Sequence, residues 1–318
     1  MSENRFRRPT YEGRPLPRPD DEVVDQGLAF DVATLMSRRR LLGLFGAGAG
    51  SALLAACGSS TGQDAASNAS SSSSSSASRS ASASSLTEIP DETAGPYPGD
   101  GSNGPDVLEE SGIVRRDIRS SFGASTTTAA GVPLTIEFTI LDMVNDDAPM
   151  VAAAVYAWHC DRDGNYSMYA DSLKNENYLR GVQVTDASGK VSFTSIFPAC
   201  YSGRWPHVHF EVYPDQASID DSTKAIATSQ MALPKDVLDV VYATDGYAQS
   251  VTNLSQVTLA TDNVFGNDSA AHQVATVTGS VDAGYVAALT APIDTSTTPA
   301  GGEAPVNGGG GAPPTGAP

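Results

Sequence analysis

The chain has 318 residues, of which 19 are Lys or Arg and 37 are Asp or Glu, so its formal charge is −18 at pH 7. No nucleic-acid partner is expected for so acidic a chain, because phosphate recognition needs clustered Lys and Arg side chains. Long stretches at both ends have little to bury, so the domain count has to be drawn from the sequence between them.

The first 57 residues resemble a lipoprotein export signal. Residues 37–40 (SRRR) precede an uncharged run of 16 residues that ends at residues 54–57 (LAAC), which is the pattern of a twin-arginine signal closed by a lipoprotein cleavage box. As a helix this run would span about 24 Å, short of the roughly 30 Å hydrocarbon core, so a permanent membrane helix is the weaker interpretation. We expect a lipid on Cys57, and an extracytoplasmic protein that is anchored to the outer face of the cytoplasmic membrane or secreted.

The segments on either side of the central region are low in complexity. Residues 58–85 consist almost entirely of Ser, Ala and Gly, which predicts a flexible linker. Residues 295–318 are rich in Gly and Pro, and we expect a disordered tail there. The remaining residues, 86–294, are enough for one well-buried β-rich domain.

Short alternating runs predict β-strands through this domain. Residues 134–141 (LTIEFTIL) alternate apolar side chains with Thr and Glu, which is the period of a half-buried strand. The same pattern is found at residues 153–158, 182–185, 190–196, 208–213 and 273–281. One helix is predicted from near Pro234, with Val237, Leu238 and Val241 on one face. Many short strands with few short helices predict an all-β fold with an antiparallel β-sandwich core.

The strand predicted at residues 208–213 is preceded by a pattern that suits a metal site. Alternation sends His207 and His209 to one face and the apolar residues beside them to the other. Tyr201 lies six residues upstream, and Tyr166 follows a predicted turn. Ferric iron is a hard cation that favours phenolate oxygen, and a bound trivalent ion would deprotonate nearby tyrosines. Two tyrosinates and two neutral histidines, completed by hydroxide, are therefore a candidate site for non-haem Fe(III).

The motifs around these residues resemble those of the intradiol ring-cleavage dioxygenases, the protocatechuate and catechol type. The strongest pieces are residues 179–186 (LRGVQVTD), 193–198 (FTSIFP) and 204–210 (RWPHVHF). Residues 93–98 (TAGPYP) resemble the T-x-G-P-Y segment that lies beside the family's substrate pocket. Only five residues separate Tyr201 from His207, where the protocatechuate type has a longer insertion, so we expect a shorter pocket rim.

The resemblance implies a reaction and a role for each matched position. The implied reaction uses O2 to cleave a catechol-type aromatic diol to a cis,cis-muconate-type dicarboxylic acid, in extracellular aromatic catabolism. Arg204 matches the arginine that stabilises charge on the substrate ring, and Tyr201 matches the tyrosinate that the substrate displaces. The implied ferric ligands are Tyr166, Tyr201, His207 and His209, and the implied substrate-contacting residues are Gly95, Pro96, Tyr97 and Gln230.

Three further hypotheses concern the same region. His159 and Asp161, with His207 or His209, have the composition of a 2-His-1-carboxylate Fe(II) oxygenase site. Cys160 and Cys200 flank the two tyrosines, and an exported domain would favour a disulfide between them. A sandwich domain on a surface lipoprotein is also compatible with a binding module that has no catalytic activity. The pattern makes no prediction of the oligomeric state or of the particular catechol.

Overall fold

The computed structural model of the chain describes residues 10–11, 14–15 and 86–299. The chain divides into two units, residues 1–76 and 77–318. In the first unit, the described residues form β1 (Thr10–Tyr11) and β2 (Arg14–Pro15), which pair antiparallel. Apart from β1 and β2, the predicted signal at residues 1–57, with Cys57, lies outside the described residues, as do the linker at 58–85 and the tail beyond residue 299. Within the described part of the chain, no helix combines the length and the apolar character needed to cross a bilayer.

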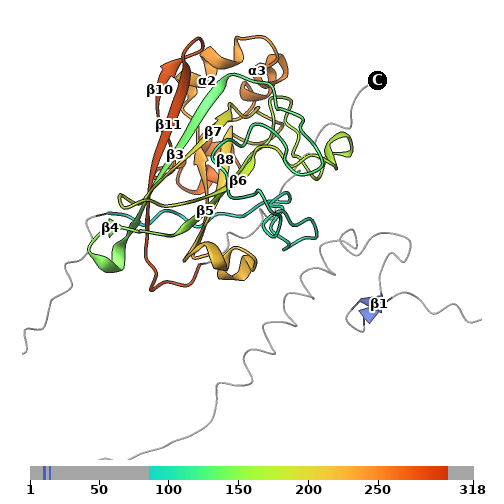
Figure 1. Cartoon of the computed structure of the whole chain (residues 1–318). Helices are drawn as coiled ribbons and strands as arrows, with labels where there is room; N and C mark the ends of the chain where they lie inside the picture. Colours follow the sequence, from blue (N-terminus) through green and yellow to red (C-terminus); the bar gives the residue numbers. More distant parts are fainter. Residues whose placement is uncertain (1–9, 12–13, 16–85, 300–318) are drawn as a thin grey trace, which may run out of the picture. The chain divides into compact units, whose positions relative to one another are not determined.

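The described part of the second unit is a two-sheet β-sandwich (Figure 1). One sheet has the order β10-β11-β3-β4, with β7 also paired to β3; its strands are β3 (Pro133–Asp142), β4 (Ala148–Pro149), β7 (Lys190–Ile196), β10 (Thr276–Ser280) and β11 (Gly284–Ile293). The other sheet has the order β6-β5-β8-β9; its strands are β5 (Ala154–Trp158), β6 (Arg180–Val184), β8 (His207–Tyr213) and β9 (Ala227–Ala232). The predicted all-β sandwich is confirmed.

All strand pairs within these two sheets are antiparallel except β3 with β11, which run parallel over nine residue pairs, Leu134–Asp142 with Tyr285–Ile293. The antiparallel prediction is wrong for this pair. A parallel neighbour cannot be joined by a hairpin and needs a long crossover, and here the connection is most of the domain. The six predicted strands are present, whereas β4, β9 and β11 were not predicted.

The space between the sheets is filled by alternating side chains from both. On β3, Leu134, Ile136, Phe138 and Ile140 are buried while the residues between them are partly exposed. Phe138 contacts Phe210 of the opposite sheet, with ring centroids 4.5 Å apart. Burying one such side chain contributes about 1.5–3 kcal/mol to the free energy of folding, so the apolar face of β8 holds the strand firmly against the opposite sheet.

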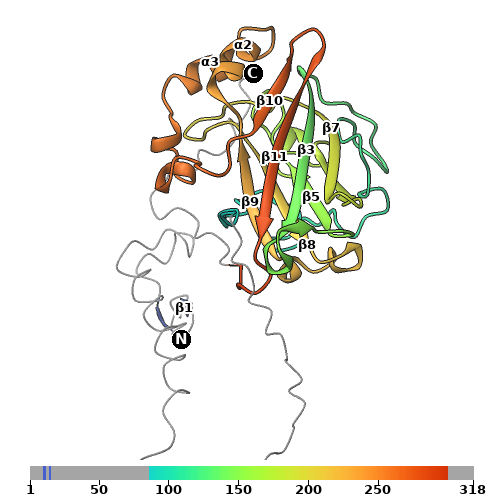
Figure 2. The same ribbon diagram turned by 90° about the vertical axis from the view of Figure 1, so that its left-hand side faces the viewer.

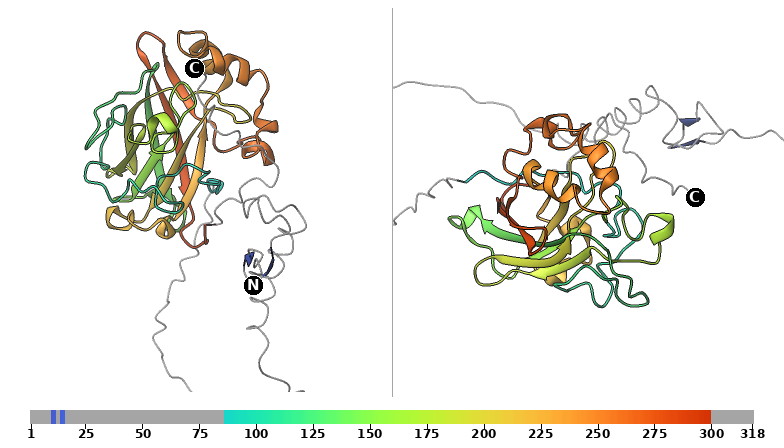
Figure 3. Two further views of the ribbon diagram at one scale, coloured as in Figure 1. Left: turned by 90° about the vertical axis from the view of Figure 1, so that its right-hand side faces the viewer. Right: turned by 90° about the horizontal axis from the view of Figure 1, so that it is seen from above.

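The β6-β5-β8-β9 sheet is buried on both faces. Every residue of β8 is buried, and so are the outward-facing Tyr156 and Trp158 of β5. Their cover comes from the chain before β3, where Val107, Leu108 and Ile113 pack into the same cluster. Figure 3 shows this teal to green segment running along the side of the strands away from the helices. The face of β8 that carries the two histidines is therefore enclosed.

The helices are few and short, and α2 and α3 lie side by side beyond one end of the strands (Figure 2). The predicted helix is α2 (Lys235–Tyr242), which starts after Pro234 and buries Leu238 and Val241. The polar sequence of α3 (Ala248–Leu254) gave no signal. The remaining helical turns are η2 (Met143–Asn145), η3 (Asp171–Leu173), η4 (Gln216–Ser218), η5 (Ser222–Lys224), η6 (Leu259–Thr261) and η7 (Phe265–Asn267).

Candidate functional site

Four predicted metal ligands meet at one point of the outward face of β8. The Nε2 atoms of His207 and His209 are 3.1 Å apart. His207 Nε2 lies 3.3 Å from Tyr201 Oη and 3.5 Å from Tyr166 Oη. All four predicted ligands thus direct a nitrogen or an oxygen toward the same small volume.

Local structure accounts for each position. His207 and His209 share a face because they are two residues apart on a strand. Tyr166 follows a turn in which Asp161 Oδ1 accepts hydrogen bonds from the backbone N–H groups of Asp163 and Asn165. Tyr201 comes from the loop before β8 and is partly exposed, whereas Tyr166 is only 2% exposed.

The hydrogen bonds of His207 define its tautomer. Its Nδ1–H donates to the carbonyl of Trp205, so its Nε2 carries a lone pair toward the other three donors. Burial, and then the positive charge of Arg204, lower the pKa of His207 to about 3, so its imidazole is neutral at physiological pH. His209 is held by stacking, with its ring 4.9 Å from that of Trp158 and an interplanar angle of 6°. Its pKa is lowered well below the usual value, first by burial.

The tyrosines do not ionise on their own. Burial raises the pKa of Tyr201 to about 12. Burial, and then the neighbouring Tyr201, raise the pKa of Tyr166 well above its usual value. A bound cation would stabilise such a set of neutral imidazoles and phenols, since it would convert the phenols to phenolates.

The spacing of the four atoms fits a shared ion. Two ligand nitrogens that bind one first-row metal at about 2.1 Å, near a right angle, lie about 3.0 Å apart, close to the 3.1 Å between the histidines. Two phenol oxygens with two imidazoles suit a hard trivalent ion better than a soft one. The residues present therefore fit Fe(III).

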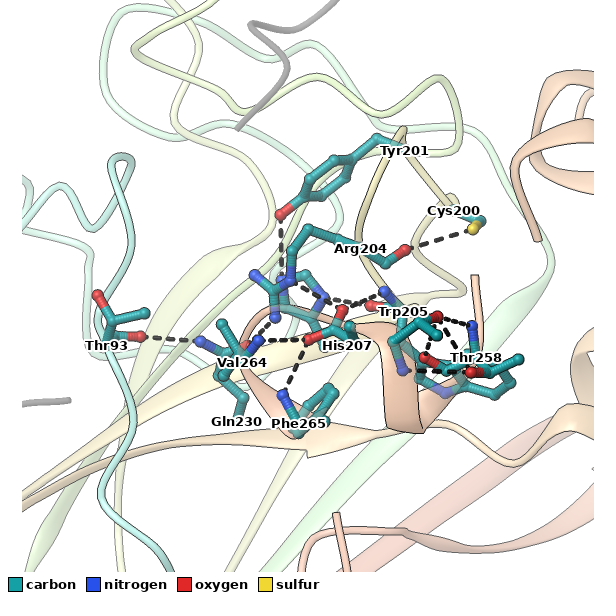
Figure 4. Close-up of polar contacts among 12 residues, drawn as sticks. Thr93, Cys200, Tyr201, Arg204, Trp205, His207, Gln230, Thr258, Val264 and Phe265 are labelled. Atoms are coloured by element: carbon teal, nitrogen blue, oxygen red, sulfur yellow. Dashed lines mark hydrogen bonds and ion pairs between the residues drawn. The ribbon is translucent and has the colours of Figure 1, made fainter. Parts of the chain in front are cut away.

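Arg204 lies beside these ligands in a buried ion pair. Its Nε donates to Asp262 Oδ2 at 3.0 Å, and its Nη2 donates to Gln230 Oε1 at 2.5 Å. Gln230 in turn donates to the carbonyl of Thr93 at 2.8 Å. Figure 4 shows Arg204 next to Tyr201 and His207. The structure thus joins Arg204 and Gln230, which the sequence indicated separately, and adds Asp262, which no sequence pattern indicated.

The segment predicted to contact substrate lies against the same ligands. Gly95 has φ +74°, and a Cβ there would stand 3.3 Å from His209 Cε1, so the backbone approaches that imidazole closely. Tyr97 packs on Tyr166 with ring centroids 5.0 Å apart. Between them, Pro96 accepts a hydrogen bond from the Asn103 side chain. The buried Arg180 fixes the segment by donating to the carbonyls of Tyr97 and Pro98.

The predicted disulfide is absent. Cys160 and Cys200 are both free and buried. Each thiol is directed at a different backbone carbonyl, that of Ala199 for Cys160 and that of Arg204 for Cys200. Burial raises the pKa of Cys200 to about 12, so this thiol is protonated at neutral pH.

His159 is not placed to bind a metal. Its Nδ1 and Nε2 are both hydrogen bonded, to the carbonyl of Cys160 and to Ser195 Oγ, each at 2.7 Å. The Asp161 carboxylate is occupied by two backbone N–H groups and by Tyr178. Nowhere in the described residues do three His, Cys, Asp or Glu side chains gather as a metal site. The 2-His-1-carboxylate hypothesis therefore lacks a carboxylate ligand in this part of the chain.

Parts of the chain are similar to known dioxygenases. A family model described as Dioxygenase matches residues 103–218. Chlorocatechol 1,2-dioxygenase of Rhodococcus opacus is 24% identical over 124 residues, covering 29% of this chain and 48% of that protein. Catechol 1,2-dioxygenase 2 of Acinetobacter lwoffii is 42% identical over 57 residues, covering 18% of this chain and 20% of that protein. The chain thus spans about half the length, or less, of these curated relatives.

Solved structures share the fold. An intradiol ring-cleavage dioxygenase from Tetranychus urticae superposes with a TM-score of 0.52 at 23% identity, and the match covers 66% of this chain and 96% of that one. Nearly the whole of that protein therefore corresponds to the sandwich described above.

Proposed function

We propose that the chain, which a family model described as Dioxygenase matches over residues 103–218, is an Fe(III)-dependent intradiol dioxygenase that cleaves a catechol-type ring with O2 to a cis,cis-muconate-type dicarboxylic acid. The observation that carries the proposal is the convergence of two phenol oxygens and two imidazole nitrogens within 3.1–3.5 Å. Tyr166, Tyr201, His207 and His209 would hold the iron. Bound there, Fe(III) supplies the Lewis acidity that deprotonates a chelating diol and activates it toward dioxygen.

Tyr201 is suited to give way to substrate and to take its proton. It is the more exposed of the two tyrosines, and it sits on a loop rather than in the enclosed position of Tyr166. Its pKa of about 12 in the absence of a cation means that the phenolate, once released, binds a proton firmly at neutral pH. Tyr201 therefore acts as the base for one substrate hydroxyl.

Arg204 stabilises negative charge on the bound ring. It is a buried cation fixed by Asp262 and Gln230, so it needs no reorganisation when charge develops nearby. Gly95 and Tyr97 form a wall beside the ligands: the glycine backbone lies against His209, and the Tyr97 ring packs on that of Tyr166 at an interplanar angle of 32°. A planar aromatic diol suits a wall of this kind.

The test uses the full chain loaded with Fe(III), its Tyr166→Phe and Tyr201→Phe variants, and Tyr285→Phe as a matched control, since the Tyr285 hydroxyl makes no hydrogen bond within residues 86–299. We expect a broad visible tyrosinate-to-iron absorption, altered in the first two variants, unchanged in the control and shifted by catechol under argon. Admitting ¹⁸O2 should give a ring-opened dicarboxylic acid that contains both labelled atoms. A colourless protein, or one that binds only Fe(II), would refute the proposal.

We also propose that the domain is exported and lipid-anchored through Cys57, after a signal at residues 1–57 and a flexible linker at 58–85. The SRRR and LAAC patterns support this. Cys57→Ser should abolish labelling by radioactive palmitate and release the protein from the membrane fraction. The double substitution Arg38→Lys and Arg39→Lys should block export. A wild-type chain that stays unlabelled in the cytoplasm would contradict the proposal.

A further inference from the structure

We propose that Asp262 is a positioning residue that fixes Arg204 and the peptide before His207 as one unit, a role that rests on the proposed function. Asp262 is 58 residues from Arg204 in the sequence and lies outside the span matched by the family model. It follows η6, in the turn that leads to η7.

The Asp262 carboxylate accepts four hydrogen bonds and is 2% exposed. Oδ2 accepts from Arg204 Nε at 3.0 Å and from the Trp205 N–H at 2.6 Å. Oδ1 accepts from the N–H groups of Val264 and Phe265 at 2.8 and 2.9 Å. Both oxygens are thus saturated, which leaves the carboxylate a single orientation (Figure 4).

Through Oδ2, Asp262 acts on two sides of the site. Its bond to Arg204 Nε, together with that of Gln230 to Nη2, holds two edges of the guanidinium. No hydrogen bond is recorded for Nη1 within the described residues, so this donor is left for charge on a ligand. A guanidinium held on two edges presents its third donor in a defined direction.

The second side concerns His207. Asp262 accepts from the N–H of Trp205, and the carbonyl of the same residue accepts from His207 Nδ1. The tautomer and ring orientation of a metal-binding histidine are set by the partner of its other nitrogen. Asp262 therefore orients that partner, while Phe265, from the same turn, packs 6.4 Å from the His207 ring.

Charge balance points the same way. Without Asp262, Arg204 would be a buried cation with no carboxylate at ion-pair distance in residues 86–299, and breaking a buried pair in this way is costly. The expected consequence is that the guanidinium moves toward solvent or another acceptor. The loss of activity should then appear in the rate of the chemical step more than in substrate affinity. Misplacement of a charge-stabilising group by about 1 Å can lower that rate on the order of 10²-fold.

The test compares Asp262→Asn with Asp282→Asn, an exposed control that removes one negative charge, in the full chain. In wild type and control, ¹⁵N NMR of the metal-free protein should show a slowly exchanging Arg204 Nε–H, assigned by its loss in Arg204→Lys; Asp262→Asn should lose this protection. In the iron-loaded protein, Asp262→Asn should lower kcat by about 10- to 100-fold with KM changed less than about threefold, and Asp262→Glu should recover part of kcat.

Unchanged Arg204 Nε–H exchange and unchanged kcat in folded Asp262→Asn would overturn the proposal. If that variant does not fold, two other results would overturn the proposal. One is rapid exchange of Arg204 Nε–H in the wild type, and the other is a kcat and KM of Asp262→Glu identical to those of the wild type. In an Arg204→Gln background, Asp262→Asn should lower kcat less than it does in the wild type, because only its effect through His207 remains; an undiminished loss would overturn the role through Arg204. Failure of the proposed function is a separate result: wild type would lack ring cleavage while the NMR comparison still reports on positioning.

Discussion

Replacing Arg180 with Met should destabilise the protein strongly, because this side chain ties together two segments of the site. Arg180 is 1% exposed. It donates to the carbonyls of Tyr97, Pro98 and Ser167, and also to Ser167 Oγ and Tyr156 Oη. It thus joins the segment of Tyr97 to Ser167, the residue that follows the proposed ligand Tyr166.

The size of the effect follows from the acceptors left behind. Methionine keeps most of the apolar stem but no donor, so the backbone carbonyls of Tyr97 and Ser167 lose their partner, whereas that of Pro98 still accepts from the Tyr156 hydroxyl. Each costs about 1–3 kcal/mol, and relief from burying a cation offsets part of the sum. We expect the free energy of unfolding to fall by about 2–4 kcal/mol. Arg180→Lys, which keeps the charge and three donors, should lose less.

Urea denaturation of the full chain measures the difference, with Arg116→Met as the matched control. Arg116 is exposed and makes one side-chain hydrogen bond, to Ser192. Its replacement should change the free energy of unfolding by no more than about 0.5 kcal/mol. A loss below about 1 kcal/mol in Arg180→Met would refute the reasoning that unpaired carbonyls dominate.

Phe210→Ala should cost about 3–5 kcal/mol in urea denaturation, while Val184→Ala, at a partly exposed position, should stay within about 0.5 kcal/mol; similar losses would show that the sheet interface is not the main core. Burial raises the pKa of Glu92 from 4.5 to about 7, so the native state holds a proton that the unfolded chain has lost and stability falls as pH rises through this range. Glu92→Gln should remove that part of the fall, and its stability relative to wild type should rise between pH 5 and pH 8; an equal difference at both pH values would contradict the shift. His159→Asn should lower stability by about 1–3 kcal/mol yet keep the tyrosinate-to-iron absorption, and loss of the absorption alone would make His159 a ligand.

Much of the sandwich was predictable because strand periodicity is local. Residues 134–141 alternate large apolar and polar side chains, and β3 buries the apolar set. β11 follows the same period, with Tyr285, Ala287, Leu289 and Ala291 buried, but alanine has low strand propensity and hides the pattern. The parallel pairing of β11 with β3 had no local signal, since it joins opposite ends of the domain.

For the site, the sequence by itself determined that His207 and His209 share a face, since alternation along a strand needs no other element. The ordered motifs also indicated Tyr166, Tyr201 and Arg204. Only the tertiary structure decided what surrounds them: the enclosure of the outer face of β8, the free thiols of Cys160 and Cys200, and the pairing of Arg204 with Asp262. Spacing in a chain reports on which way neighbouring side chains point, whereas contacts between distant segments depend on how whole elements pack, and no short-range period records that.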